Sequence, residues 1–183
     1  MGVAEDRLRV RFGLLDANSD GVLEQRDFET LVERVIAASG AGERSPEAVA
    51  ARTAALGYWQ GLREHADSDN DGVVDIDEFT AVVHDQEAFD RYVRPYAEAT
   101  AALADGDNDG QVQRDRYLAI VKASGFPSEA VETVFAGFDA EGSERLTRSG
   151  WIDIVEGFYT RRGAHFTDRL SGPDPGSPHG ADR

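Results

Sequence analysis

Residues 16–28 read DANSDGVLEQRDF, and residues 67–79 read DSDNDGVVDIDEF. In each stretch, oxygen-bearing side chains occupy places 1, 3 and 5, a glycine occupies place 6, and a carboxylate occupies place 12. This pattern has the period of neither a helix nor an amphipathic strand. Alternate side chains can face one point while the glycine takes a turn with positive φ, which suits a loop around an oxygen-liganded cation. The two stretches therefore predict metal-binding loops.

Two further stretches repeat this rhythm less completely: DGDNDG begins at Asp105, and DAEGSE begins at Asp139. Apolar residues with helical spacing flank all four stretches. Place 8, where paired loops would join in a short β-bridge, is apolar throughout, as Leu23, Val74, Val112 and Leu146. The sequence thus predicts an all-α fold of four helix–loop–helix units in two pairs, each pair joined by a β-bridge between its loops.

These units divide the chain into three predicted segments. Residues 1–85 would hold the first pair and residues 86–162 the second pair. Residues 163–183 contain three of the six prolines and four glycines, so a flexible tail is predicted there. The alternative is that Phe166 and Leu170 dock this tail on the body of the protein.

Composition excludes several function classes. The chain has 183 residues, with 35 Asp and Glu against 19 Lys and Arg and a net charge of −16, so we expect no nucleic-acid partner. It contains no apolar run long enough to span a membrane and no apolar signal core at the N-terminus, which predicts a cytoplasmic protein. Cysteine is absent, the four histidines are scattered, and no phosphate-binding or nucleophile motif occurs. We therefore predict that the protein is not an enzyme.

The two complete motifs resemble the EF-hand superfamily of calcium-binding proteins. Within it, residues 4–162 resemble the four-EF-hand sarcoplasmic calcium-binding proteins and their bacterial relative calerythrin. An Asp at place 12 of the first loop, followed by Phe28, is also how the first loop of that subgroup looks. Arginine outnumbers lysine eighteen to one, a bias that suggests a GC-rich genome and agrees with a bacterial source.

The resemblance implies a set of calcium ligands for each loop. In the first loop they would be Asp16, Asn18, Asp20, the Val22 carbonyl, Glu24 and Asp27. In the second loop they would be Asp67, Asp69, Asp71, the Val73 carbonyl, Asp75 and Glu78. In the third loop they would be Asp105, Asp107, Asp109 and the Gln111 carbonyl.

The later loops depart from the motif. Arg116 places a positive charge at place 12 of the third loop, so we expect that site to be weak or metal-free, with Arg116 turned outward or paired with the carboxylates. The alternative is a partial site completed by waters. In the fourth loop, Glu144 replaces the turn glycine and Gly150 replaces the closing acid, which makes it degenerate. Asp27 is shorter than Glu, which predicts a tighter first site that also accepts Mg²⁺.

The types of apolar residue in the sequence favour a calcium buffer over a calcium sensor. Sensors expose flexible, methionine-rich grooves, and Met1 is the single methionine of this chain. We therefore predict intracellular calcium buffering or transport by a monomer that requires no protein partner. The alternative is a calcium-dependent interaction protein that regulates a partner.

Overall fold

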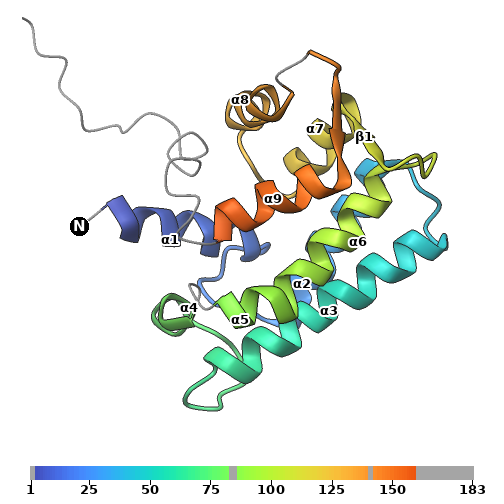
Figure 1. The fold of residues 1–183 in the computed structure, drawn as a ribbon. Helices are drawn as coiled ribbons and strands as arrows, with labels where there is room; N and C mark the ends of the chain where they lie inside the picture. The colour runs from blue at the N-terminus through green and yellow to red at the C-terminus, as the bar shows by residue number, and fades with distance from the viewer. Residues whose placement is uncertain (1–2, 83–85, 140–141, 160–183) are drawn as a thin grey trace, which may run out of the picture.

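The computed structural model describes residues 3–82, 86–139 and 142–159, and the predicted tail at 163–183 lies outside them. Helices make up most of this structure, with one small antiparallel sheet (Figure 1). In chain order the elements are α1 Val3–Leu15, α2 Gln25–Ser39, α3 Pro46–Ala66, α4 Ile76–Val82, α5 Gln86–Ala88, the π-helix η1 Phe89–Val93, α6 Arg94–Ala104, β1 Gln111–Gln113, α7 Arg114–Ala123, α8 Ser128–Phe138, β2 Arg145–Thr147 and α9 Arg148–Tyr159.

The helix ends follow ordinary capping rules. Ser45 accepts a hydrogen bond from the Ala48 amide and so caps α3, with Pro46 at the first helical position. Gly40 ends α2 in the left-handed conformation, with φ of 71°. These caps fix where α2 ends and α3 begins.

The helix that enters the third loop begins earlier than the sequence predicts. The alanine-rich run after Pro95 predicts a helix that starts there, but α5, η1 and α6 run on from Gln86 through this proline. In η1 the Arg94 amide donates to the Phe89 carbonyl, five residues back. A π-turn of this kind shifts the hydrogen-bond register next to a proline that has no N–H to donate.

The four loops associate in two pairs, which confirms the predicted fold class. Leu23 and Val74 form an isolated antiparallel bridge, with N–H···O distances of 2.8 and 3.0 Å. Strands β1 and β2 pair with Val112 opposite Leu146. The bridge residues are buried in each case.

The two halves of the molecule share their core. Helix α3 packs against α6, and α2 packs against α7, so the halves lie side by side (Figure 1). One apolar cluster combines Val32 and Ala51 with Tyr117 and Trp151. The boundary at residues 85 and 86 lies at the edge of a segment outside the described residues, and it stays a prediction.

The helical spacing of apolar residues around loop four predicts that Phe138 and Trp151 build the core of the second pair, but the two residues behave differently. Trp151 is buried, whereas Phe138 is 40% exposed at the last position of α8. The expectation that Phe138 builds the core was wrong, because Val131, Val134 and Phe135 already supply the buried face of α8. Within the described residues, no helix combines the length and apolar character needed to cross a membrane.

Candidate metal centre

Loop one, residues 16–27, folds its side chains back on its own amides. The Asp16 carboxylate accepts hydrogen bonds from the Asp20 and Gly21 amides at 3.2 and 3.0 Å. Asn18 Oδ1 accepts from the Asp20 amide at 2.9 Å, and Asp20 Oδ1 accepts from the Val22 amide at 3.2 Å. Gly21 has φ of 90°, the left-handed value predicted for place 6. The loop therefore holds the side chains of places 1, 3 and 5 together.

Asp27 closes loop one from the first turn of α2. Its Oδ1 accepts from the Ala17 and Asn18 amides at 3.1 and 3.3 Å, and its Oδ2 accepts from the Glu24 amide at 2.8 Å. Burial raises the pKa of Asp27, against the lowering effect of these amides. Glu24, the ligand predicted at place 9, is paired instead with the exposed Arg26. Place 9 commonly reaches the ion through a water, so this pairing fits the motif.

Loop two, residues 67–78, gathers three carboxylates in one place. Oxygens of Asp67, Asp69 and Asp71 lie within 4.8 Å of one another. Each pair of like charges at this spacing repels by about 1 kcal/mol even in water. Asp67 Oδ1 is buried, and no hydrogen bond to it occurs among the described residues. An orphaned carboxylate oxygen beside two more carboxylates fits a hard cation with oxygen ligands.

Glu78 closes loop two as Asp27 closes loop one. Its Oε1 accepts from the amide and hydroxyl of Ser68 at 2.8 and 2.9 Å, and its Oε2 accepts from the Asp75 amide at 3.1 Å. Backbone donation from Ser68 and Asp75 lowers the pKa of Glu78, which keeps it ionised. Asp75 Oδ1 accepts from the amides of Asp77 and Glu78, so this place-9 residue caps α4.

Loop three, residues 105–116, holds a comparable acidic cluster, but an arginine side chain already lies beside it. Oxygens of Asp105, Asp107 and Asp109 also lie within 4.8 Å of one another. Arg148 Nε, from the first turn of α9, lies 2.7 Å from Asp105 Oδ2, whose side chain is fully buried. The two atoms form an ion pair without hydrogen-bond alignment. Arg148 also hydrogen-bonds Asn108 Oδ1.

Neighbouring groups reinforce this arrangement in loop three. Arg145 Nη1 lies 3.6 Å from Asp109 Oδ2. Burial acts to raise the pKa of Asp105, but donation from the Gly110 amide and the charge of Arg148 outweigh it, so the pKa lies below its usual range. The fourth unit thus neutralises carboxylates of the third.

Arg116 takes neither of the positions expected for it. Its guanidinium lies against Gly106, where a Cβ atom would have no room, and Nη1 donates to the Ser39 carbonyl at 3.2 Å. Ser39 ends α2, so Arg116 links loop three to the first half of the molecule. A cation near a helix C-terminus is favourable, which explains why the side chain crosses over.

Loop four keeps the backbone of a metal-binding loop without its ligands. Asp139 accepts from the Ser143 and Glu144 amides at 2.7 Å each, which matches Asp16 with its fifth and sixth residues in loop one. Glu144 adopts φ of 57° at the place where the other loops have glycine. The shape of loop four is therefore held by Asp139 and by the pairing of β2 with β1.

The structure brings together most of the predicted ligands. Three residues were predicted to offer their backbone carbonyls as ligands: Val22, Val73 and Gln111. Each follows a left-handed glycine and precedes a bridge residue, as predicted. The sequence motifs did not predict that Arg148 would pair with Asp105. The signal was present, since place 10 of loop four carries an arginine while the paired loop lacks a closing acid.

Two known proteins are similar to this chain in sequence. No protein-family model matches the chain. It is 39% identical over 71 residues to a Penaeus sarcoplasmic calcium-binding protein, beta chain, a match that spans 38% of this chain and 37% of that protein. It is 26% identical over 166 residues to calerythrin of Saccharopolyspora erythraea, which covers 87% of this chain and 94% of calerythrin.

Solved structures agree with these relatives. A Streptomyces coelicolor calcium-binding protein superposes with a TM-score of 0.73 at 25% identity, over 93% of this chain and 99% of that one. An amphioxus sarcoplasmic calcium-binding protein shows the same fold, with a TM-score of 0.68 at 18% identity over 96% of this chain and 100% of that one.

Fold and loops together define an EF-hand architecture. The resemblance predicted from the loop motifs is confirmed: the proteins similar to this chain are EF-hand calcium-binding proteins, among them sarcoplasmic calcium-binding protein and calerythrin.

Proposed function

We propose that the protein binds Ca²⁺ at loops one and two. The observation that carries this proposal is the convergence of Asp67, Asp69 and Asp71, in which Asp67 Oδ1 is buried and accepts no hydrogen bond from the described residues. Loop one has the same backbone frame, with Asp27 in the place of Glu78. The relatives named as calcium-binding proteins support the choice of ion.

The proposed stoichiometry is two ions. In loop three, Arg148 already stands beside Asp105, and place 12 carries no carboxylate. A divalent ion at Asp105, Asp107 and Asp109 would have to displace this guanidinium. We therefore propose that loop three binds calcium weakly or not at all, and that Mg²⁺ competes at loop one.

The proposed role is calcium buffering or transport in a bacterial cytoplasm, by a monomer without catalytic activity. The two halves pack on each other through α3 with α6 and α2 with α7. Stiff aromatic and branched side chains fill the shared core, and no methionine-rich groove supports target capture.

A sensor is the second candidate. The Streptomyces coelicolor protein that superposes on this chain is described in terms of prokaryotic calcium-mediated regulation. A sensor would expose apolar surface when calcium binds, whereas a buffer would keep its core closed.

Calcium titration calorimetry of the full chain, with and without Mg²⁺, tests the binding proposal. We expect two strong sites, of which one weakens in Mg²⁺; a chain that binds no calcium would refute it. Fluorescence of an apolar dye, measured with calcium and with chelator, separates the two roles. A large rise with calcium would favour the sensor, and a small change the buffer.

A further inference from the structure

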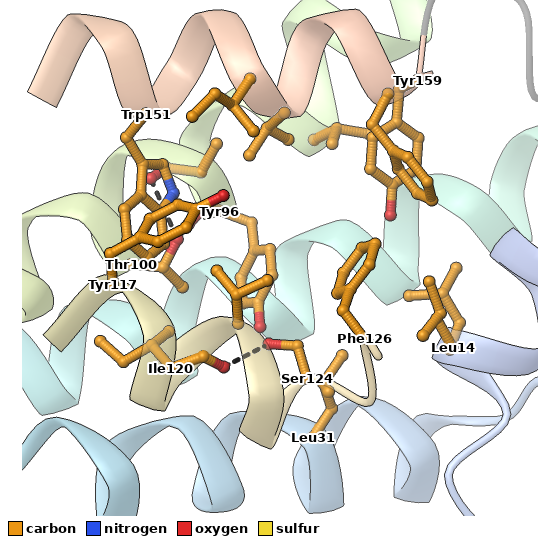
Figure 2. A pocket seen from close by; sticks show the side chains of 17 residues that line it. Leu14, Leu31, Tyr96, Thr100, Tyr117, Ile120, Ser124, Phe126, Trp151 and Tyr159 are labelled. Carbon is orange, nitrogen blue, oxygen red and sulfur yellow. Dashed lines mark hydrogen bonds between the residues drawn. The ribbon is translucent and has the colours of Figure 1, made fainter. Parts of the chain in front are cut away.

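A cavity of about 100 Å³ lies between the two halves of the molecule. Its walls come from the end of α1, from α2, from η1 with α6, from α7 and its following turn, and from α9. Figure 2 shows Trp151 at one end of this cavity and Phe126 and Tyr159 at the other. The cavity is separate from the acidic sides of the four loops.

The lining selects for a neutral occupant. Among the described residues that line the cavity, none carries a charged side chain. Burial raises the pKa of Tyr96 and of Tyr117, so both hydroxyls stay protonated at neutral pH. The buried Arg11 guanidinium lies behind the lining, over the Phe158 and Tyr159 rings at 5.0 and 5.8 Å, and donates to the Tyr159 carbonyl. A charged molecule would therefore lose its hydration in the cavity without direct contact with a counter-charge.

The lining also favours an aromatic ring. Six aromatic side chains contribute to it: Tyr96, Tyr117, Phe126, Trp151, Phe158 and Tyr159. Tyr117 and Trp151 meet edge to face with centroids 5.4 Å apart, and Phe126 and Phe158 do so at 5.1 Å. Apolar cavities of about 150 Å³ take up benzene. This space is smaller, but it is partly open to solvent, so it has room for one ring and little more.

One polar group in the wall has no partner. The Thr100 hydroxyl donates to the carbonyls of Tyr96 and Ala97, and the Ser124 hydroxyl donates to the Ile120 carbonyl (Figure 2). Trp151 is 4% exposed, and its indole Nε1 is buried without a hydrogen-bond partner among the described residues. A buried N–H donor that stays unpaired is costly, so an acceptor placed beside it would be held firmly.

We propose that this cavity binds a small neutral molecule with one aromatic ring and one hydrogen-bond acceptor, with the acceptor placed on the Trp151 indole N–H. The ring would lie among the aromatic side chains, and the acceptor would satisfy the orphaned donor. The proposal does not rest on the proposed calcium function, because none of the predicted calcium ligands lines the cavity.

A matched pair of probes isolates the hydrogen bond. Benzonitrile carries an acceptor nitrogen, and phenylacetylene has nearly the same shape without a strong acceptor. We would titrate each into the full chain labelled with ¹⁵N and follow the two indole N–H resonances, assigned with a Trp59→Phe variant. Trp59 is buried in the other core cluster and does not line the cavity, so it serves as the internal control.

We expect benzonitrile to shift the Trp151 resonance saturably and to bind about fivefold to tenfold more tightly than phenylacetylene, the effect of one hydrogen bond. In Trp151→Phe, which keeps a ring but lacks the donor, the two probes should bind equally, as measured on the backbone amide resonances of residues that line the cavity, such as Thr100 and Ser124. Val121→Phe, which fills the cavity, should abolish saturable binding of both while the Trp59 resonance keeps its position.

Three results would overturn the proposal. They are no saturable shift with either probe, equal affinity for both probes in the unaltered chain, and equal shifts of the Trp59 and Trp151 resonances. The last would mark general solvation of the protein by the probes.

Discussion

The two pairs of loops have almost the same backbone but opposite ways of balancing their carboxylates. In loop two the acidic side chains converge with no basic partner among the described residues, and Asp67 keeps an oxygen without a hydrogen bond there. In loop one a basic residue, Arg26, pairs with Glu24 at the exposed edge of the loop, and Asp16 and Asp27 accept hydrogen bonds from backbone amides. In loop three the same convergence is met by Arg148 and Arg145 from the paired loop. On the proposed function, the first pair would take an external cation, whereas in the second pair arginines of the chain itself lie beside the carboxylates.

Removal of calcium should produce the largest difference between the pairs. At a calcium concentration of 100 times Kd, each site adds about 2.7 kcal/mol of stability. Chelator should therefore lower the melting temperature of the full chain by about 10–20 °C. Hydrogen exchange should accelerate at the Gly21 and Gly72 amides while the Val112–Leu146 pairing stays protected. Equal loss of protection in both pairs would contradict the comparison.

Glu78→Gln should remove half of this effect. The variant loses one unit of charge and the bidentate closure of loop two, so calorimetry should count one ion fewer per chain. In chelator the variant should be slightly less stable than the unaltered chain, because its amide oxygen can accept from Ser68 but its NH₂ group cannot accept from the Asp75 amide.

Asp115→Asn is the matched control for Glu78→Gln. It removes one exposed acid beside loop three that occupies no ligand place. Its ion count should not change; a loss of one ion here would attribute the Glu78 result to general charge.

Arg148→Ala should destabilise the second pair without any metal present. The variant leaves the buried Asp105 carboxylate without its counter-charge, which should cost about 1–3 kcal/mol in urea unfolding measured in chelator. Arg145→Ala removes a half-exposed partner at 3.6 Å and should cost less than about 1 kcal/mol. Equal costs for the two variants would refute the role assigned to Arg148.

A third strong calcium site should appear only when both obstacles in loop three are removed. The double variant Arg116→Glu, Arg148→Ala supplies a closing carboxylate and frees Asp105, so calorimetry should count one additional ion. Arg116→Glu alone should bind this ion more weakly, because Arg148 still competes for Asp105. Failure of the double variant to gain an ion would show that another feature blocks the loop.

Asp27→Glu should produce the smallest change, one of selectivity. The longer side chain allows a larger, bidentate coordination shell at loop one, which favours Ca²⁺ over Mg²⁺. Millimolar Mg²⁺ should then weaken calcium binding at loop one less than in the unaltered chain. An unchanged Mg²⁺ effect would mean that Asp27 does not set the selectivity.

Much of this comparison was predictable from local sequence. The places of the ligands, the left-handed glycines and the bridge partners Val112 and Leu146 all follow from a twelve-residue motif, because such a loop fixes its own geometry. Phe138 and Arg148 were not predictable in this way. Their environments depend on which helix faces are already filled and on what the partner loop presents across a β-bridge, which are properties of the assembled pair.

The continuation of the helix before loop three through Pro95 was also not predictable from local sequence. Proline ordinarily marks a helix start, and only the π-turn at Phe89–Val93 lets the helix continue through it. Such a turn changes which backbone amides are paired, and no side-chain pattern in the sequence records that choice.

The isolated bridge between Leu23 and Val74 links the two proposed ions in another way. The carbonyls of Val22 and Val73 stand one residue before the bridge, so the main-chain ligand of each ion belongs to a ribbon shared by both loops. An ion in one loop orders this ribbon for the other, and the second ion then loses less conformational entropy when it binds. We therefore expect the loops to fill cooperatively, so that the chain passes from empty to full over a narrower range of calcium concentration than two independent sites would give.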